Sequence, residues 1–335
     1  MYLPLRRKFI FTALLVLAVF MVSFNIGCEP QPEAEPPGSP EEDTPPIPPE
    51  IAEGEDREPV LSVYKHEEDT VEEMNMEEYI AGVVAGEMEP DWPIEALAAQ
   101  AIIARTFTLQ KIAEEGGVPE KDAHASTDIE EFQAYSAEDV TDNVRKAVQL
   151  TKGEVACHDD QFIKAWFSAY AGPKTALADE GLGFEEGNPP YIYIVNNPGE
   201  EIVPSEEAFW THSFDEEKVR SAVEEETGEE PGEIEEIEIE EVGPSGRAVT
   251  MLVNDTEVSA PDLRLAIGSE EMRSTLIEEE DIEVDEGEVT MGGEGFGHGV
   301  GVCQWGAKAK AEDGSSPEDI IDFFYKDIEI VTLWN

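Results

Sequence analysis

The sequence predicts an α+β protein in which helices and antiparallel strands are mixed. Two observations predict this class. Residues 75–107 carry apolar side chains at helical spacing. Residues 234–242 instead alternate Ile with Glu, and turns lead from them into short segments at 248–253 and 257–258, which is typical of a meander of half-buried strands. Both kinds of element are therefore expected in one folded domain.

The first 27 residues predict an export signal. Residues 6–8 are basic, and the apolar run behind them is shorter than the ~20 residues that cross a bilayer. Residues 25–28 read Asn-Ile-Gly-Cys and resemble a bacterial lipobox. We therefore expect lipidation of Cys28 and an extracytoplasmic protein anchored to the outer face of the cytoplasmic membrane. An uncleaved membrane anchor and release after ordinary cleavage are the alternatives.

Residues 28–58 predict an extended linker. Pro, Glu and Gly dominate this segment, so it cannot build a core, and repulsion between its charges extends it further. The folded domain is expected over residues 59–335. It should open with a strand at 60–64, where apolar side chains alternate.

Residues 75–107 predict two helices. The first is expected to begin at Asn75, which together with Glu78 is close to a capping box. The second follows Pro93, which suits a first helical turn. It is apolar on almost every side, which predicts a buried helix.

Glu87 is the informative anomaly of the first helix, because it continues the apolar face of Val83 and Val84. Desolvation favours the protonated form of a carboxyl and raises its pKa. A general acid must be protonated near neutral pH, which makes Glu87 a candidate. The alternative is that Glu87 caps its helix or pairs with Arg105. A buried Arg105 needs a partner, which is either Glu87 or a substrate oxygen.

The rest of the chain predicts short elements separated by turns. Each rests on apolar spacing of period 3.6 or 2 between Gly, Pro or Asn breaks. In order they are a helix at 143–151, a hairpin at 153–166, a strand at 192–195, a helix at 206–228, strands at 234–242, 248–253 and 257–258, and a helix after Ser316.

A resemblance now adds to these patterns. The run Tyr79-Ile-Ala-Gly-Val-Val-Ala-Gly-Glu-Met-Glu-Pro-Asp-Trp-Pro through Phe107 resembles the signature helices of the SpoIID/LytB domain family, with Glu89 where Pro is usual. Residues 295–307 resemble the family's glycine-rich second signature. The resemblance covers roughly residues 60–330 and implies an α+β fold. The family includes sporulation stage II protein D and the amidase enhancer LytB.

The resemblance implies site residues. Glu87 corresponds to the family's catalytic glutamate. The expected substrate-binding residues are Gln100, Arg105, Gln133, Tyr135, His298, Gln304 and Trp305. Among these, Trp305 would stack on a sugar ring and Gln304 would hydrogen-bond hydroxyl or N-acetyl groups. His298 has an alternative as a packed residue satisfied by the backbone.

Metal and cofactor binding are not expected. Some relatives carry His and Cys as zinc ligands where this chain has Ser168 and Tyr170, and a zinc site needs imidazole and thiolate. Outside the lipobox, Cys157 and Cys303 are enough for one disulfide, but the sequence leaves their pairing open.

The charge balance excludes one class of partner. The chain has 78 Asp plus Glu against 21 Lys plus Arg, a formal charge of −57. Nucleic acid is not an expected partner, because phosphate binding needs the opposite sign. We interpret the acidity as adaptation to high salt, which screens repulsion between like charges. An acidic protein from an ordinary environment is the alternative.

The resemblance also implies an activity. The expected enzyme is a peptidoglycan lytic transglycosylase that cleaves the MurNAc–GlcNAc β-1,4 bond and leaves a 1,6-anhydroMurNAc end. Its partners would be glycan strands and a wall amidase or other sporulation hydrolase. The alternatives are a non-catalytic wall-binding activator of an N-acetylmuramoyl-L-alanine amidase, or a passive lipoprotein. The changes at Ser168 and Tyr170 favour the alternatives.

Overall fold

A computed structural model describes residues 44–335. The expected signal segment, the lipidation of Cys28 and most of the expected linker lie outside these residues. Within them, no helix is both long and apolar enough to cross a membrane. The sheet begins before residue 59, because Ala52 and Glu53 form β1 and pair with β2.

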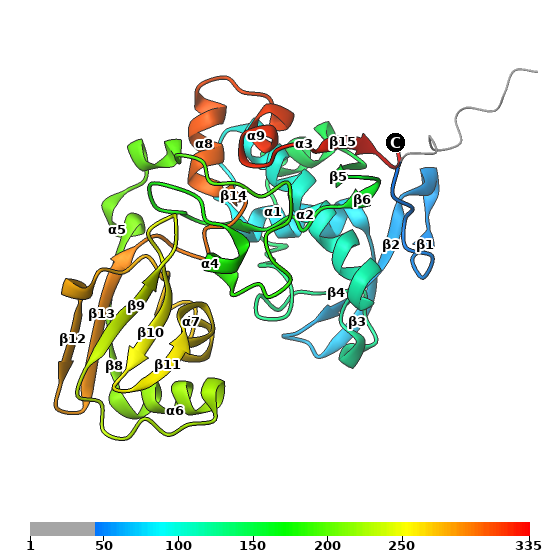
Figure 1. Cartoon of the computed structure of the whole chain (residues 1–335). Helices are drawn as coiled ribbons and strands as arrows, with labels where there is room; N and C mark the ends of the chain where they lie inside the picture. The colour runs from blue at the N-terminus through cyan, green and yellow to red at the C-terminus, as the bar shows by residue number, and fades with distance from the viewer. Residues whose placement is uncertain (1–43) are drawn as a thin grey trace, which may run out of the picture. The chain divides into compact units, whose positions relative to one another are not determined.

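The described residues bury two hydrophobic cores, and Figure 1 shows the elements around each. Five helices surround the first core: α1 (Met76–Glu87), α2 (Ile94–Glu115), α3 (Asp142–Leu150), α8 (Gln304–Glu312) and α9 (Pro317–Phe324). The second core packs beneath α6 (Glu216–Thr227) and α7 (Ala260–Ile267). Short helices α4 (Ala178–Leu182) and α5 (Ser205–Ala208) lie in the connecting segments.

Three sheets accompany the first core. One contains β1 (Ala52–Glu53), β2 (Pro59–Lys65), β3 (Thr70–Asn75) and β4 (Ala125–Ser126). Another contains β5 (Glu154–His158), β6 (Gln161–Phe162) and β15 (Glu329–Thr332), and the third pairs β7 (Phe167–Ser168) with β14 (Val302–Cys303). Most pairs are antiparallel, as expected, but β2–β4 and β7–β14 are parallel.

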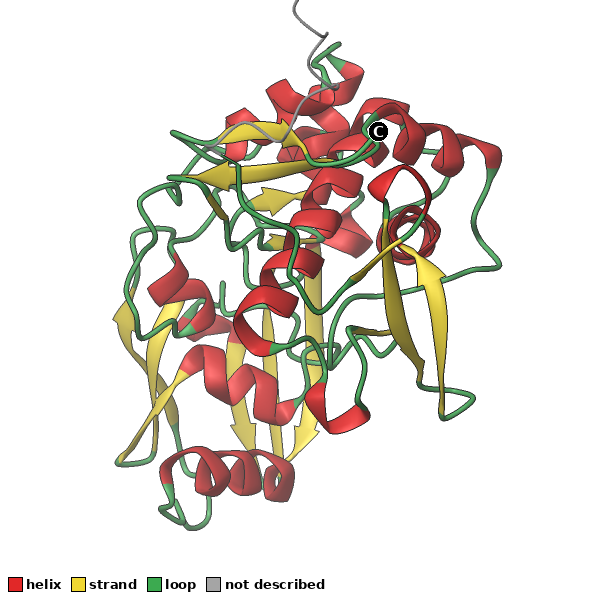
Figure 2. Ribbon diagram, turned by 90° about the vertical axis from the view of Figure 1, so that its right-hand side faces the viewer, coloured by secondary structure: helices red, strands yellow, loops and turns green. Residues whose placement is uncertain are grey.

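Two antiparallel sheets accompany the second core. One is β8 (Phe209–Asp215), β12 (Ile282–Asp285) and β13 (Glu288–Glu294), with β13 in the middle. The other is the expected meander of β9 (Ile237–Val242), β10 (Ala248–Val253) and β11 (Thr256–Ser259). Figure 2, a view from the side, shows these strands together with the helices that cover them.

The two central helices form where the sequence predicts them. Asn75 occupies the N-cap of α1, although its side chain makes no capping hydrogen bond. The second helix starts directly after Pro93 and continues to Glu115, where Gly116 ends it in the left-handed conformation. Most of its side chains are buried between α1, α3, α8 and β5, which explains its apolar character on nearly every side.

Two expected elements form only in part. The helix expected at 206–228 is interrupted by strand β8, whose Trp210 and Phe214 point into the core while Thr211 and Ser213 face solvent. The strand expected at 192–195 forms only an isolated bridge between Ile192 and Tyr325. In both places long-range packing decides the conformation of an apolar segment.

Candidate active site

Glu87 ends helix α1 and lines a pocket of about 400 Å³. Parts of the chain that are far apart in the sequence form its walls. They are residues 86–87 and Phe107 from the first two helices, 129–134 from the following loop, 166–169 around β7, 264–270 from the end of α7, and 296–298 with Gln304 from the glycine-rich segment. The pocket therefore has one wall from each hydrophobic core.

The Glu87 carboxyl is held by one hydrogen bond to each oxygen. The backbone N–H of Ala134 donates to Oε1 at 2.8 Å, and the Gln304 side-chain amide donates to Oε2 at 3.2 Å. Burial raises the pKa of Glu87 to about 7, and these two hydrogen bonds oppose the rise. Glu87 thus populates both protonation states near neutral pH, which suits proton transfer in either direction.

Glycines in α1 let the loop that carries Ala134 approach Glu87. A Cβ at Gly86 would lie 2.6 Å from the backbone nitrogen of Tyr135, and one at Gly82 would lie 2.2 Å from the Tyr135 ring. The N–H of Ser136 donates to the carbonyl of Gly82 at 2.9 Å, which fixes the loop against the helix. The small residues of the first signature therefore position a hydrogen-bond donor at the acid.

Gln133 and Tyr135 belong to this loop but have different surroundings. Gln133 lines the pocket, and its Nε2 donates to Thr108 Oγ1 at 3.1 Å while its buried Oε1 has no partner among the described residues. Tyr135 does not line the pocket. Its ring stacks on Tyr79 with centroids 5.7 Å apart, so its observed role is to pack the loop on α1.

His298 also lines the pocket and is a neutral imidazole. Its Nδ1 accepts the backbone N–H of Val300 at 3.0 Å, which leaves the ring proton on Nε2. Burial, followed by the charges of Arg264 and Arg247, lowers the pKa of His298 to about 3. His298 therefore does not supply a positive charge at neutral pH, and its ring contacts the backbone at both Val300 and Phe167, as the packed alternative expects.

The glycines on either side of His298 are required by their surroundings. Gly297 and Gly299 have φ of 102° and 76°, in the left-handed region. A Cβ at Gly297 would lie 2.6 Å from the Cβ of Ser168, and one at Gly299 would lie 2.2 Å from the Arg247 guanidinium. These glycines allow the histidine loop to lie directly on its neighbours.

Gln304 and Trp305 are neighbours at the start of α8, but their side chains have different surroundings. Gln304 faces the pocket and contacts Glu87, as described above. Trp305 lies outside the pocket wall and packs on Trp92, with ring centroids 4.8 Å apart and the Lys308 ammonium 4.5 Å from its ring. The structure therefore does not place Trp305 beside the acid.

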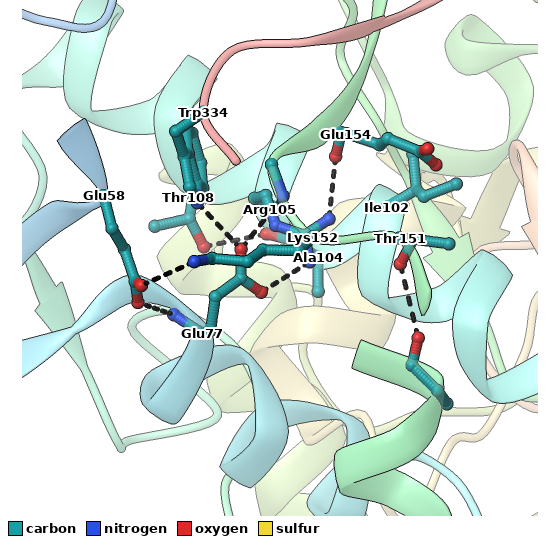
Figure 3. Close-up of polar contacts among 12 residues, drawn as sticks. Glu58, Glu77, Ile102, Ala104, Arg105, Thr108, Thr151, Lys152, Glu154 and Trp334 are labelled. Carbon is teal, nitrogen blue, oxygen red and sulfur yellow. Dashed lines mark hydrogen bonds and ion pairs between the residues drawn. The ribbon is translucent and has the colours of Figure 1, made fainter. Parts of the chain in front are cut away.

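Arg105 is fully buried and does not line the pocket. Figure 3 shows its contacts: Nη2 forms an ion pair with Glu77 at 2.7 Å, and Nη1 donates to the Glu154 carbonyl at 2.7 Å. Glu77 also accepts from the Trp334 indole and the Gly153 N–H, each at 3.0 Å. Arg105 thus pairs with Glu77 rather than Glu87 and stabilises the core.

Gln100 is likewise fully buried in α2 and outside the pocket wall. Its side-chain amide has no hydrogen-bond partner among the described residues. Its expected contact with substrate is not supported by this position.

The structure also shows the surroundings of the residues considered for metal binding and for a disulfide. Ser168 lines the pocket with a buried hydroxyl that has no partner among residues 44–335, and the Tyr170 hydroxyl donates to Glu294 at 2.9 Å. Cys157 and Cys303 are both buried free thiols, so they are not paired with each other. The Cys303 sulfur instead caps α8 by accepting the Gly306 N–H.

Sequence reasoning missed Arg264 as a pocket residue. It lies on α7 between the buried Leu263 and the exposed Leu265, and it lines the same pocket as Glu87. A lone arginine in an apolar helix is a detectable signal, but its proximity to residue 87 depends on packing between the two cores.

Comparisons with known proteins agree with these observations. Residues 64–158 match the family model described as "Stage II sporulation protein", and residues 202–301 match a domain of unknown function. An uncharacterised protein of Brachyspira hyodysenteriae is 30% identical over 264 residues, which cover 78% of this chain and 68% of the relative.

Two relatives from Bacillus subtilis carry descriptive names. "Stage II sporulation protein D" is 28% identical over 81% of this chain and 78% of its own length. "Amidase enhancer" is 28% identical over 73% of this chain but only 39% of its own length. With the two signature segments meeting at one pocket, these matches show that the chain belongs to the SpoIID/LytB family.

Proposed function

We propose that this protein is a peptidoglycan lytic transglycosylase with a role in cell-wall remodelling during sporulation. The observation that carries the proposal is the Glu87 carboxyl, which lines a pocket with its pKa raised to about 7. The relatives named for stage II of sporulation support the biological setting.

One carboxyl can perform the whole proton balance of this reaction. Protonated Glu87 gives its proton to the glycosidic oxygen, which leaves as the 4-hydroxyl of GlcNAc when the bond between MurNAc C1 and GlcNAc O4 breaks. The C6 hydroxyl of the same MurNAc attacks C1 and returns its proton to the Glu87 carboxylate. The product is a 1,6-anhydro ring, and the enzyme is restored. Because the nucleophile belongs to the substrate itself, one carboxyl can serve where most glycosidases use two.

The pocket's neutral polar groups suit a sugar. Gln133 Oε1 and Ser168 Oγ are buried without partners in the described part of the chain, and ligand hydroxyl or amide groups would satisfy them. Phe107, Phe132 and Phe296 supply apolar surface for the faces of sugar rings. These contacts would orient a strand across Glu87.

The test compares Glu87→Gln with the matched variant Glu89→Gln, which changes an exposed carboxyl two residues away. Each full-length protein is incubated with glycan strands that carry or lack stem peptides, and products are identified by mass spectrometry. Glu87→Gln should lose ~10²-fold or more of anhydro-product formation, because the amide cannot deliver a proton. Glu89→Gln should retain wild-type activity. Undiminished cleavage by Glu87→Gln contradicts the catalytic assignment.

The second candidate is a non-catalytic activator of a wall amidase. The relative named amidase enhancer favours it, as does Ser168 at the position where histidine is common in the family. This function predicts no anhydro products from the wild type, and equal stimulation of a wall amidase by the wild type and Glu87→Gln. In either case we propose that the lipobox-like segment anchors the protein outside the cytoplasmic membrane.

A further inference from the structure

Arg264 is nearly buried in the pocket wall without a carboxylate partner. Its exposed fraction is 8%, and it lines the same pocket as Glu87. Its Nε donates to the Arg273 carbonyl at 3.1 Å and its Nη2 to the Ser269 carbonyl at 3.3 Å. Nη1 has no hydrogen-bond partner among the described residues, so part of the guanidinium fork is unused.

This lack of a partner is unexpected in so acidic a protein. The chain has 78 Asp plus Glu residues against 21 Lys plus Arg, so carboxylates are in large excess. Arg105 and Arg220 both form ion pairs with Glu. Over residues 44–335, Arg264 forms none, and Glu270 acts on it only from a longer distance. Burying an unpaired guanidinium is costly and needs an explanation.

A second buried arginine, Arg247, lies close to His298. It is fully buried, and its charge adds to the effects of burial and of Arg264 in lowering the pKa of His298. Among the described residues its hydrogen-bond partners are neutral, the Ser245 hydroxyl and the carbonyls of Ala171 and Lys174, and the carboxylates of Glu180 and Glu294 act on it without forming an ion pair. His298 itself is neutral, as shown by its hydrogen bonding to Val300. Among the described residues that line the pocket, Arg264 is thus the one cation, and the carboxyls in the same lining are Glu87 and Glu270.

We propose that Arg264 is a specificity-determining residue that binds a carboxylate of the ligand, and this inference rests on the glycan-binding function proposed above. A guanidinium fork binds carboxylates through charged, paired hydrogen bonds. In a strand of MurNAc and GlcNAc, the one ionisable group is the lactyl carboxyl on C3 of MurNAc. It belongs to the same sugar ring whose C1 must lie at Glu87, so both groups fall within one pocket. When a stem peptide is attached, this carboxyl is a neutral amide.

The experiment measures binding rather than turnover, so that it does not depend on catalysis. Full-length protein carrying Glu87→Gln is titrated with two oligosaccharides of equal length. One has free lactyl carboxylates, and in the other these groups are converted to carboxamides. The carboxylate form should bind about tenfold more tightly or better, as expected for a charge-assisted pair. Added NaCl should weaken its binding more than that of the carboxamide.

Two variants in the same background separate recognition from structural support. Arg264→Gln should reduce the preference for the carboxylate to within about twofold, because the charge is gone. Arg220→Gln, which removes an arginine of α6 outside the pocket wall, should leave the preference unchanged. If Arg264→Gln does not fold, Arg264→Lys retains the charge without the fork and should give an intermediate preference.

Three outcomes overturn the inference. If the starting protein binds both oligosaccharides with equal affinity, it has no site that recognises the carboxylate. Parallel weakening of both by Arg264→Gln, with the preference intact, makes the residue purely structural. If the starting protein binds neither oligosaccharide, both the proposed glycan binding and this inference are contradicted. A preserved carboxylate preference in a wild type that cleaves nothing instead supports Arg264 while contradicting the catalytic role of Glu87.

Discussion

Glu87 is a carboxyl on which opposing effects act. Desolvation favours its protonated form, while the N–H of Ala134 and the amide of Gln304 favour the charged form. Desolvation is the largest effect, and the pKa rises from 4.5 to about 7. The hydrogen bonds keep the value close to neutrality, where the same group can give a proton and accept one back.

A raised carboxyl pKa makes stability depend on pH in a defined direction. Between pH 4.5 and 7 the folded state binds more protons at Glu87 than the unfolded state, so the free energy of unfolding falls as pH rises. Because Gln does not titrate, Glu87→Gln should gain stability relative to the wild type between pH 5 and pH 8, by up to about 3 kcal/mol. Urea unfolding of both proteins at the two pH values measures this difference.

The control for this prediction is Glu89→Gln. Its difference from the wild type should be the same at both pH values, since Glu89 is exposed. A Glu87→Gln difference that is constant with pH, or that shrinks as pH rises, contradicts the assigned environment of Glu87.

At the scale of elements, helix α1 and the loop at 133–136 form one unit. The helix supplies the acid, and the loop supplies one of its hydrogen-bond donors. Their contact depends on Gly82 and Gly86, where a side chain would enter the space of Tyr135. This explains why α1 of this chain carries glycines one helical turn apart.

Gly86→Ala should push the loop at 133–136 away from helix α1. The new Cβ would meet loop backbone, which cannot rotate away, so we expect a loss of ~1–3 kcal/mol despite the better helix propensity of Ala. Loss of the Ala134 hydrogen bond should raise the pKa of Glu87 further and move the alkaline limb of the pH–activity profile to higher pH. Thermal melts and pH–rate profiles measure both effects.

Tyr135→Phe is the matched change on the loop side. It keeps the ring stacked on Tyr79 and removes only a hydroxyl whose contact is the Met74 sulfur at 3.7 Å. Activity and melting temperature should therefore stay close to those of the wild type. A large loss of activity with Tyr135→Phe would instead indicate that this hydroxyl contacts the substrate.

The buried pair of Arg105 and Glu77 joins α1 and α2 to the C-terminal residues. Arg105→Leu should destabilise the protein by ~3–5 kcal/mol, because Glu77 would lose its compensating charge in a largely buried place. The double variant Arg105→Leu, Glu77→Leu should recover part of this loss. Glycan affinity per folded molecule should not change in either variant. A selective loss of affinity with unchanged stability would mean that Arg105 contacts substrate after all.

On the scale of the whole molecule, the formal charge of −57 predicts a response to salt. Added NaCl screens repulsion between the surface carboxylates, so the melting temperature should rise from low to molar NaCl. For a domain of this size, each 1 kcal/mol corresponds to roughly 2–4 °C. Melts in NaCl, with sucrose as an uncharged co-solute control, measure the effect. A flat or falling midpoint in NaCl would mean that the acidity has another purpose.

Local patterns predicted more of the helices than of the site. The strong apolar spacing at 75–107 located α1 and α2, whereas residues 206–228 were ambiguous. Trp210 and Phe214 are four apart, which satisfies a helix, but positions 210, 212 and 214 also alternate as a strand does. Pairing of β8 with β13, some 80 residues later, decides between them.

The site shows the same limit. Glu87, Gln133, His298 and Gln304 meet in one pocket, but their catalytic and binding roles remain predictions. Arg105 and Gln100 look alike in sequence, as polar residues of an apolar helix, and only packing shows that both face the core. Arg264 was missed because it meets Glu87 through tertiary contacts between the two cores, and the local spacing of apolar residues gives no information about such contacts.

The division of the pocket between two cores has a consequence for how new specificities could be acquired. The acid lies in the segment 64–158, while Arg264 and His298 lie in the segment 202–301, and each segment matches its own family model. On the roles proposed above, exchanging the second segment for that of a relative would replace the wall that carries Arg264 and leave Glu87 in place. Ligand preference could then change within such a family while the proposed acid stays the same.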